Sequence, residues 1–176
     1  MSETSKAHKR QAPRKLRFGI FVCSTSRYQA YKDGKTVEDV SGELISELVC
    51  KAGHELVSHG LLPDDQQRIR SALKEALDSE NIDVIVFSGG TGISPKDVTI
   101  EAVEPLLEKL LPGFGELFRK LSYEQIGSAA ILTRASAGVA RGKAVFCIPG
   151  SPNAVKLCFE KLILPEAAHI LKHSRE

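Results

Sequence analysis

Short apolar runs constrain the fold of this chain more than any other feature of its sequence. Residues 16–24 (LRFGIFVCS), 82–87 (IDVIVF) and 144–149 (AVFCIP) are rich in β-branched and aromatic residues and show little polar alternation. Runs of this kind are typical of strands that are covered on both faces, as in a parallel sheet. Residues 54–63 (HELVSHGLLP) are expected to form one more strand with its exit loop.

Helical segments separate these strands. Residues 36–54 and 64–79 repeat apolar side chains at the spacing of one helix face, and Gly53 is a natural C-cap for the first of them. A polar loop is predicted over 24–35 and a hairpin over 129–150. Three further helices are predicted over 99–111, 112–127 and 151–173. The second of these follows a Gly-Phe-Gly turn, and the third is expected to bend or break near Pro165. Strands that alternate with helices in this way predict an α/β fold of three layers (αβα) with a mostly parallel central sheet.

Charge and length divide the chain into a short tail and one domain. Six Lys and Arg residues lie among the first 17 residues, against one acid, and they more than account for the formal net charge of +2. The slightly acidic remainder argues against a nucleic-acid surface. We predict a basic, disordered tail over residues 1–15 and a single domain over 16–176, which is long enough to bury a core.

The sequence favours the cytoplasm. Its N-terminus lacks the apolar core of a secretory signal, and no stretch reaches the ~18 apolar residues that a membrane span needs. The cysteines, which are Cys23, Cys50, Cys147 and Cys158, form no C-x-x-C pair. Buried, inert thiols in a reducing compartment are therefore favoured over disulfides or a metal site.

Four loops that follow strands carry most of the residues with useful chemistry. In an open α/β sheet, ligands bind outside the carboxyl ends of the strands. The loops expected at that edge are Ser24–Arg27, Pro63–Asp65, Ser88–Asp97 and Pro149–Asn153. A binding or catalytic site is expected where these loops meet.

The loop after residue 87 is unusually rich in glycine. Its core residues are Gly89, Gly90, Thr91 and Gly92. Glycines let backbone N–H groups point into a concavity, and the N-terminus of a following helix adds donors and partial positive charge. Alone, such a motif is weak and is more often a tight turn, but together with a second glycine loop and two acids at the same edge it favours a phosphate-bearing ligand. It is neither a P-loop nor a dinucleotide fingerprint, and a plain tight turn remains the alternative.

Both glycine-containing loops lead into predicted helices. The second candidate phosphate cradle consists of Pro149, Gly150, Ser151 and Asn153. There, Ser151 is placed as an N-cap, with Pro152 at the first helical position. In the first loop, Ser94–Asp97 resembles a capping box, and Asp97 or Thr99 could serve as the cap instead.

Two acids, Asp64 and Asp97, belong to the same predicted edge. Alone, Asp64 is explained as an acid that the helix dipole favours, and Asp97 as a helix cap. Beside a polyphosphate, however, carboxylates need a cation between them and the phosphates, and Mg²⁺ is the usual mediator. The loops together therefore predict Mg²⁺-assisted phosphoryl or nucleotidyl transfer from a nucleotide.

His169 and His173 stand four residues apart on the last predicted helix. That spacing would suit a pair of metal ligands. Because no third ligand is evident in the sequence, a solvent-facing side of the helix is favoured over a metal site.

Five segments resemble the MoaB/MogA family of molybdenum cofactor biosynthesis, which includes the G domain of gephyrin. They are LLPDD, GGTGISPKDVT, PGFGELFRKLSYEQIG, LTRASAG and IPGSPNAV, in the family's order, and the resemblance covers roughly residues 16–170. The resemblance implies a three-layer α/β fold that forms trimers or, in some MoaB-type members, hexamers. It also implies Mg-ATP-dependent adenylylation of molybdopterin with release of pyrophosphate, and a downstream metal-insertion protein that uses the product.

The resemblance assigns roles to individual residues. Asp64 and Asp97 match the two functional aspartates, as catalytic and metal-binding residues, and Ser122 matches a serine implicated in molybdopterin binding. The implied nucleotide and phosphate cradle is formed by Ser24, Gly89–Gly92 and Pro149–Asn153. Lys96 or Arg27 is a candidate to offset the charge of the leaving pyrophosphate.

One departure bears on activity. The first loop reads T-S-R-Y, as in MoaB-type members, some of which lack the first aspartate. This chain keeps that residue as Asp64, which favours an active adenylyltransferase. A non-catalytic molybdopterin-binding or scaffold protein of the same pathway, and an unrelated nucleotide-binding sensor, are the alternatives.

Overall fold

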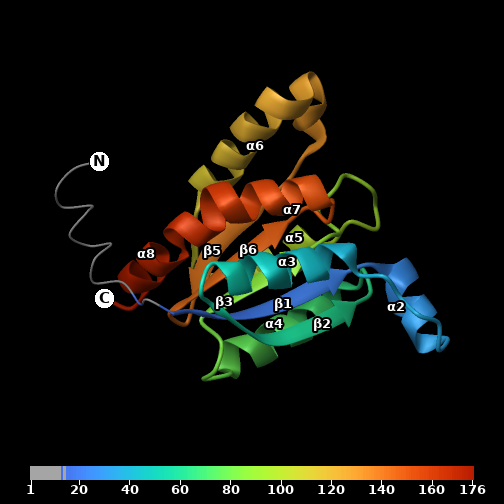
Figure 1. Ribbon diagram of the computed structural model, residues 1–176, viewed down its shortest axis with the longest axis horizontal. Coiled ribbons are helices and arrows are strands. Elements are labelled where there is room, and N and C mark those ends of the chain that lie inside the picture. The colour runs from blue at the N-terminus through green and yellow to red at the C-terminus, as the bar shows by residue number, and fades with distance from the viewer. Residues whose placement is uncertain (1–12, 14) are drawn as a thin grey trace.

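The protein is built around one six-stranded sheet (Figure 1). The computed structural model describes Pro13 and residues 15–176. The strands are β1 (Arg17–Cys23), β2 (Glu55–Leu62), β3 (Val84–Ser88), β4 (Lys109–Leu110), β5 (Ser136–Ala140) and β6 (Lys143–Ile148). They lie in the order β2-β1-β3-β6-β5-β4. β2, β1, β3 and β6 are parallel, β5 is antiparallel to β6, and β4 is antiparallel to β5. The predicted mostly parallel sheet and the hairpin within 129–150 are confirmed.

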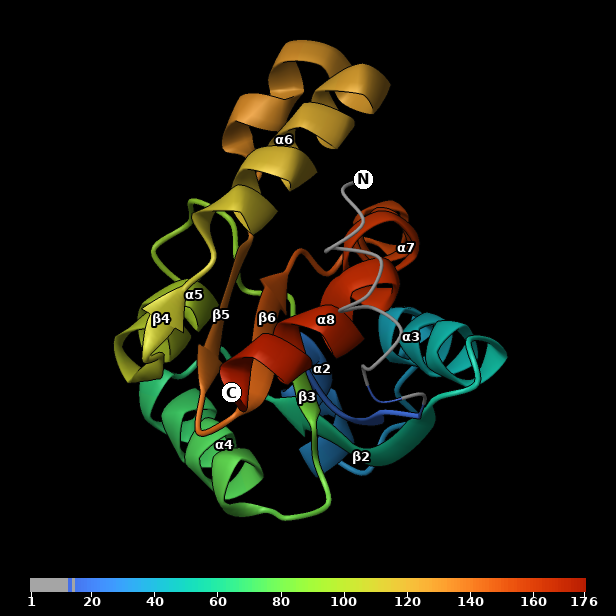
Figure 2. The same ribbon diagram turned by 90° about the vertical axis from the view of Figure 1, so that its left-hand side faces the viewer.

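Helices cover both faces of the sheet. They are α2 (Thr25–Lys32), α3 (Val40–Lys51), α4 (Gln66–Asp78), α5 (Thr99–Val103), α6 (Pro112–Ile126), α7 (Pro152–Cys158) and α8 (Leu164–Ser174). α3, α7 and α8 pack on one face and α4 and α5 on the other, whereas α6 rises away from the body of the molecule (Figures 1 and 2). This arrangement confirms the predicted three-layer αβα class.

The alternation of side chains along β3 explains why its sequence is apolar throughout. Val84 and Val86 face the cluster under α3, α7 and α8, while Ile85 and Phe87 face the cluster under α4 and α5. All four side chains are fully buried. A strand between two cores has no polar face, as predicted for a parallel sheet covered on both sides.

The segment 24–35 is a helix where a loop was predicted. α2 spans Thr25–Lys32, and its turn closes at Gly34, whose N–H donates to the Tyr31 carbonyl. None of the side chains of α2 is buried. A helix without an apolar face lacks the period that marks helices in a sequence, so the prediction was wrong here.

The prediction of one helix over 99–111 was also wrong. α5 ends at Val103, a 3₁₀ turn follows over Glu104–Leu106, and the chain then forms the short edge strand β4. Pro105 lacks the N–H that would continue an α-helix. Beyond it, the N–H groups of Glu108 and Leu111 donate to carbonyls of β5, which draws the segment into the sheet.

Two helix boundaries differ in detail from those predicted. α6 begins at Pro112, so Gly113–Gly115 lie inside its first turn rather than in a turn before it. The irregularity near Pro165 is a π-helical turn over Phe159–Ile163, which joins α7 to α8 without a break. After α3, Gly53 stands at φ +80°, one residue beyond the C-cap Ala52.

Three of the cysteines are buried and one is exposed. Cys23, Cys147 and Cys158 lie in the cores, and burial raises the pKa of the Cys23 thiol to about 12. Cys50 lies on the solvent side of α3, so the prediction of burial was wrong for it. All four are free thiols.

The predicted basic tail, residues 1–15, lies outside the described residues except for Pro13 and Lys15. In the part of the chain that the structure does describe, helices long and apolar enough to cross a membrane are absent.

A buried aspartate joins the start of the sheet to the end of the chain. The Asp83 carboxylate, whose side chain is 7% exposed, accepts hydrogen bonds from the Arg17 N–H at 3.0 Å, from Arg17 Nε at 2.9 Å and from Arg175 Nη2 at 2.8 Å. Burial alone would raise the pKa of this carboxyl, but the hydrogen bonds from the two arginines outweigh it and hold the pKa well below its usual range.

We expect Asp83→Asn to lower the free energy of unfolding by about 2 kcal/mol at pH 7, less than the 3–5 typical of a fully buried pair because both arginines are partly exposed. Because the folded-state pKa is depressed, the stabilisation is complete above the unfolded pKa of about 3.9 and is lost as the pH falls below it. Urea unfolding at pH 7 and at pH 3 measures both effects. The matched control is Asp78→Asn, which removes an exposed partner of Arg141 and should cost under ~1 kcal/mol. Equal losses of unfolding free energy in the two variants would contradict a stabilising role for the buried Asp83 carboxylate.

Candidate active site at the carboxyl edge of the sheet

The four predicted loops meet at one edge of the sheet. The Ser24 N–H after β1 donates to the Leu62 carbonyl at the end of β2 (2.8 Å). The Gly89 N–H after β3 donates to the Ile148 carbonyl at the end of β6 (2.9 Å). Since β2, β1, β3 and β6 are parallel neighbours, their exit loops lie side by side, as predicted.

The glycines allow this loop to pack against its neighbours. At Gly89, where φ is +102°, a Cβ would stand 2.4 Å from the Cys23 carbonyl oxygen. At Gly90, where φ is +62°, it would stand 2.9 Å from Asp64 Oδ1, and at Gly92 it would stand 2.7 Å from Asp97 Oδ2. Real Cβ atoms do not approach other atoms so closely, and the φ angles of the first two disfavour L side chains. The glycines therefore bring both candidate aspartates against one loop.

Asp64 is held in place by the start of α2. Its Oδ2 accepts hydrogen bonds from the N–H and from the hydroxyl of Thr25, both at 2.8 Å, and its own N–H donates to Thr25 Oγ1 at 2.9 Å. Its Oδ1 is left pointing toward Gly90. Thr25 is a positioning residue that the sequence prediction did not single out, because the partner lies 39 residues away in the chain.

Asp97 closes a turn rather than capping a helix. Its Oδ2 accepts from the Ser94 N–H and its own N–H donates to the Ser94 carbonyl, both at 2.9 Å. α5 begins at Thr99 after Val98, and within residues 15–176 no side chain caps that end. The capping-box hydrogen bond from the Ser94 N–H to the Asp97 side chain does form, but it closes a turn rather than a helix, and neither Asp97 nor Thr99 caps α5. Instead, the Thr99 hydroxyl donates to the Gly89 carbonyl at 2.8 Å and ties the helix to the loop.

Arg134 supports the loop from the other side. Its Nε donates to the Thr91 carbonyl at 2.9 Å and its Nη1 to Glu101 Oε1 at 2.7 Å, and this second bond lowers the pKa of the Glu101 carboxyl. Thr91 itself is 3% exposed. The sequence showed Arg134 only as part of the LTRASAG segment, and only the fold reveals its contact with a loop 43 residues earlier.

The Pro149–Asn153 loop begins α7 as predicted. Ser151 is its N-cap, with the side chain accepting from the Ala154 N–H, and Pro152 is the first helical residue. The Ser41 hydroxyl donates to the Gly150 carbonyl at 2.6 Å, and a Cβ at Gly150 would lie 3.2 Å from the Gly89 Cα. The two predicted phosphate cradles are therefore in contact.

The other predicted site residues are placed less centrally. Ser24 lies at the loop edge, with its hydroxyl 3.3 Å from that of Ser26. Arg27 forms an ion pair with Asp39 at 3.3 Å. Ser122 is buried on α6, and among the described residues no hydrogen bond joins it to the loops. Its predicted role in molybdopterin binding stays a prediction.

The two aspartates suit a hard divalent cation. In the described part of the chain, neither Oδ1 atom accepts a hydrogen bond, so Asp64 and Asp97 each keep one oxygen for a ligand. Across residues 15–176, no set of three or more His, Cys, Asp and Glu side chains is arranged to hold a metal. Mg²⁺ commonly takes one or two carboxylates and completes its shell with water and substrate phosphates, which fits this pair.

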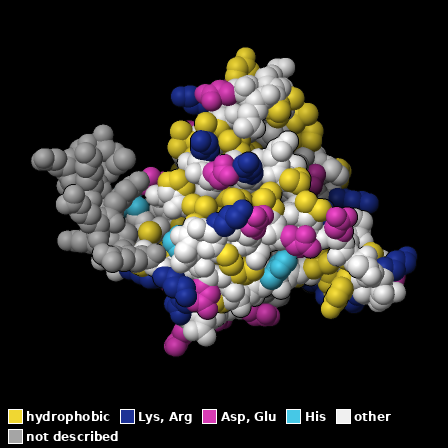
Figure 3. Space-filling model, viewed as in Figure 1, with side chains coloured by type: hydrophobic (Ala, Val, Ile, Leu, Met, Phe, Trp, Pro, Cys, Tyr) yellow, Lys and Arg dark blue, Asp and Glu magenta, His cyan; other side chains and the backbone are white. Residues whose placement is uncertain are grey.

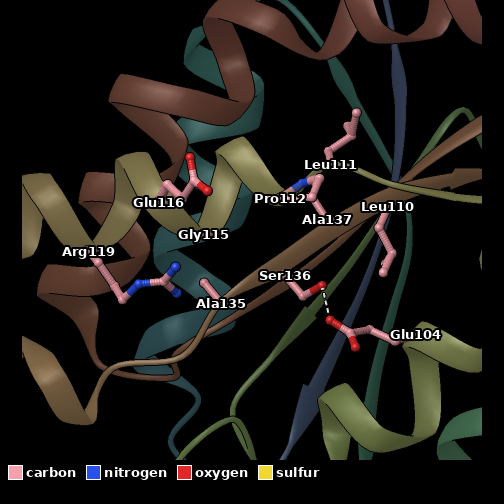
Figure 4. A pocket seen from close by; sticks show the side chains of 10 residues that line it. All are labelled: Glu104, Leu110, Leu111, Pro112, Gly115, Glu116, Arg119, Ala135, Ser136 and Ala137. Atoms are coloured by element: carbon pink, nitrogen blue, oxygen red, sulfur yellow. Dashed lines mark hydrogen bonds between the residues drawn. The ribbon is translucent and has the colours of Figure 1, made fainter.

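A separate cavity of about 210 Å³ lies beside α6, β4 and β5 (Figure 4). Glu104 and Ser136 form its floor, with the hydroxyl donating to Glu104 Oε1 at 2.6 Å, and the side chain of Arg119 reaches over Ala135. Its lining contains none of the predicted loop residues.

A mostly parallel α/β sheet whose strand-end loops hold two carboxylates against a glycine turn belongs to the class of α/β domains that bind ligands at the carboxyl edge of the sheet. Comparison with known proteins narrows that class. The family described as "Probable molybdopterin binding domain" matches residues 19–169. The chain belongs to this family, the MoaB/MogA family of molybdenum cofactor biosynthesis, and the predicted resemblance is confirmed.

Individual relatives agree with this placement. Molybdenum cofactor biosynthesis protein B of Bacillus cereus is 46% identical over 164 residues, 93% of each chain. The protein of Pyrococcus furiosus named molybdopterin adenylyltransferase is 46% identical over 173 residues, 96% of this chain and 97% of its own. The crystal structure of the tungsten cofactor synthesizing protein MoaB from Pyrococcus furiosus superimposes with a TM-score of 0.82 at 46% identity, covering 94% of this chain and 100% of that one.

We expect Gly90→Ala to lower the free energy of unfolding by about 1–3 kcal/mol, because a Cβ at positive φ would also meet Thr99 Oγ1 at 2.5 Å and Asp64 Oδ1. Urea denaturation measures the change. Gly113→Ala is the matched control, since a Cβ there meets nothing within 4 Å, and it should be neutral or stabilise the protein by up to ~1 kcal/mol. If Gly90→Ala is as stable as Gly113→Ala, the close packing described for this loop is wrong.

Proposed function

We propose that this protein is a molybdopterin adenylyltransferase, which transfers AMP from Mg-ATP to molybdopterin and releases pyrophosphate. The observation that carries the proposal is the placement of Asp64 and Asp97 against the single turn Gly89–Gly92, each with one carboxylate oxygen available. Relatives from Pyrococcus furiosus and Methanocaldococcus jannaschii carry the names molybdopterin adenylyltransferase and probable molybdopterin adenylyltransferase. In this proposal the enzyme acts in the cytoplasm.

The proposed reaction is an in-line displacement at phosphorus. An oxygen of the terminal phosphate of molybdopterin forms a bond to the α-phosphorus of ATP, while the bond from that phosphorus to the bridging oxygen of pyrophosphate breaks. Mg²⁺ bound by Asp97 and Asp64 would neutralise charge on the phosphates. The backbone N–H groups of Gly90–Gly92 and the N-terminus of α7 would supply further donors for phosphate oxygens, whereas the Gly89 N–H already donates to Ile148. No covalent enzyme intermediate is needed.

Positive side chains near the turn complete the proposed charge balance. Arg27 is paired with Asp39, so it is a poorer candidate than the sequence indicated. Arg134 already contacts the turn through Thr91, and in the described residues its Nη2 makes no hydrogen bond. We propose that Arg134 and the exposed Lys96 together neutralise the negative charge of the leaving pyrophosphate.

Asp97→Asn should reduce pyrophosphate release by about 10²–10³-fold, the size of effect seen when one charge-stabilising group is lost from a transition state. The measurement is pyrophosphate formed from Mg-ATP and molybdopterin. Asp65→Asn is the matched control: it makes the same chemical change one residue after Asp64, where the side chain caps α4, and Asn is an equally good cap. Near-normal turnover in Asp97→Asn would contradict the proposed role of Asp97 in binding Mg²⁺.

The same assay separates the alternatives. A wild-type protein that binds molybdopterin but releases no pyrophosphate is a pterin-binding or scaffold protein. One that binds ATP, ignores molybdopterin and releases no pyrophosphate is a nucleotide sensor. The proposed enzyme hands its adenylylated product to a metal-insertion protein, which is its proposed downstream partner.

We also propose that the chain forms a homo-oligomer, a trimer or a hexamer. Exposed apolar side chains gather on the projecting α6 and the 3₁₀ segment that follows it (Figure 3). They are Leu117, Tyr123, Ile126, Ile131 and Leu132, and Ile131 is 84% exposed. Contiguous apolar surface of this kind is typical of a protein–protein interface.

Light scattering should therefore give a solution mass of three or six times the chain mass of 19.1 kDa. Leu117→Asp combined with Ile131→Asp should shift the mass toward that of the monomer, because charges cannot be buried in an apolar contact. Lys120→Asp, on the same helix, is the control for a charge change and should leave the mass unchanged. A monomeric wild-type protein would contradict the proposal.

A further inference from the structure

Two histidines of α8 face each other at hydrogen-bond distance. His169 and His173 stand one helical turn apart, with their Nε2 atoms 3.0 Å from each other. The centroids of the two rings are 4.8 Å apart, and the ring planes are inclined at 61°. The sequence showed the spacing of the pair, but the distance between the two nitrogens comes from the structure.

A carboxylate lies against the other nitrogen of each ring. Glu166 Oε2 is 3.2 Å from His169 Nδ1, and Glu176 Oε2 is 3.1 Å from His173 Nδ1. An ionised carboxylate only accepts hydrogen bonds, so each Nδ1 must carry a hydrogen. In a neutral imidazole, that leaves a lone pair and no hydrogen on Nε2.

With a hydrogen on each Nδ1 atom, the two facing Nε2 atoms are suited to bind a cation. Two neutral rings held in this way would direct two lone pairs at each other across 3.0 Å, which is repulsive. The contact becomes favourable when a cation lies between the nitrogens, either one added proton or a metal ion. A carboxylate on the remote nitrogen fixes the ring and raises its basicity, which is the usual support of a metal-binding histidine.

The geometry and the surroundings favour a transition-metal ion. Zinc–imidazole bonds of about 2.0–2.1 Å at a tetrahedral angle put the two nitrogens about 3.3 Å apart, so a small rotation of the rings would suffice. The pair also lines a cavity of about 550 Å³ between α8 and the edge strands β4 and β5, in which waters could complete the coordination. α8, which ends near the C-terminus, passes beside β5 (Figure 2).

We propose that His169 and His173 bind one divalent transition-metal ion through their Nε2 atoms, with Zn²⁺ as the ion that fits best. Imidazole nitrogen suits zinc, nickel and copper rather than Mg²⁺. The site is separate from the one proposed for Mg-ATP, because its cavity contains none of the strand-end loop residues. The proposal does not depend on the enzymatic function.

Titration calorimetry with ZnCl₂ at pH 7.5 tests the site. The parent protein carries Cys50→Ser, because the exposed Cys50 thiol could bind zinc on its own. We expect one equivalent of zinc to bind to this parent. His169→Gln and His173→Gln should each weaken binding at least ~10-fold, and Glu166→Gln should weaken it ~10–100-fold through the orientation of His169.

His59→Gln is the matched control, since it removes an imidazole on β2 that pairs with Asp39. It should leave the zinc affinity unchanged, and none of the α8 variants should alter pyrophosphate release. A long-range ¹H–¹⁵N spectrum should show both α8 rings as Nδ1–H tautomers in the presence of zinc, with shifts at both Nε2 atoms. The proposal is overturned if the parent binds no zinc at a single saturable site, or if the α8 variants bind it as tightly as the parent.

Discussion

The site depends on how closely the turn after β3 packs against the end of β1. At Gly89, the backbone passes so near to the Cys23 carbonyl that a single added carbon would stand 2.4 Å from it. The Gly89 N–H donates to the Ile148 carbonyl and the Gly89 carbonyl accepts from the Thr99 hydroxyl, so this residue is tied to β6 and to α5. Once this turn is fixed, the positions of the acids on either side of it follow.

The electrostatics of this edge are arranged by hydrogen bonds rather than by burial. Asp64 and Asp97 each use Oδ2 to accept hydrogen bonds from the chain, and in the described residues the Oδ1 of each accepts none. The unbonded oxygen of Asp64 lies toward Gly90, whereas for Asp97 the bonded oxygen lies nearest to Gly92. In the proposed function, two acids beside backbone donors bind a phosphate group only with a cation between them. This arrangement suits a substrate that arrives as a metal–nucleotide complex, because metal and phosphates are then bound together.

The proposed site and the Asp83 contact lie at opposite ends of the sheet. The carboxyl ends of the strands hold the glycine turn and the aspartates, in loops that many hydrogen bonds support. At the opposite end, Asp83 fastens the first strand to Arg175 at the end of the chain. The residue after α8 therefore helps to hold the C-terminal helix against the sheet. The histidine pair of α8 lies away from the loops of the proposed reaction.

The elements whose side chains meet a core could be predicted from the sequence. β1, β3 and β6 were predictable because two-sided burial demands apolar residues along nearly the whole strand, and α3 and α4 because one face must be apolar. α2 and β4 were not predictable from the same signal: α2 buries no side chain, and β4 exists through its pairing with β5. The four loops were likewise predictable as neighbours from the order of strands and helices. The individual contacts within these loops, such as Thr25 with Asp64 and Arg134 with Thr91, are seen only in the folded structure. They join residues about 40 positions apart, and local sequence carries no signal for such a pairing.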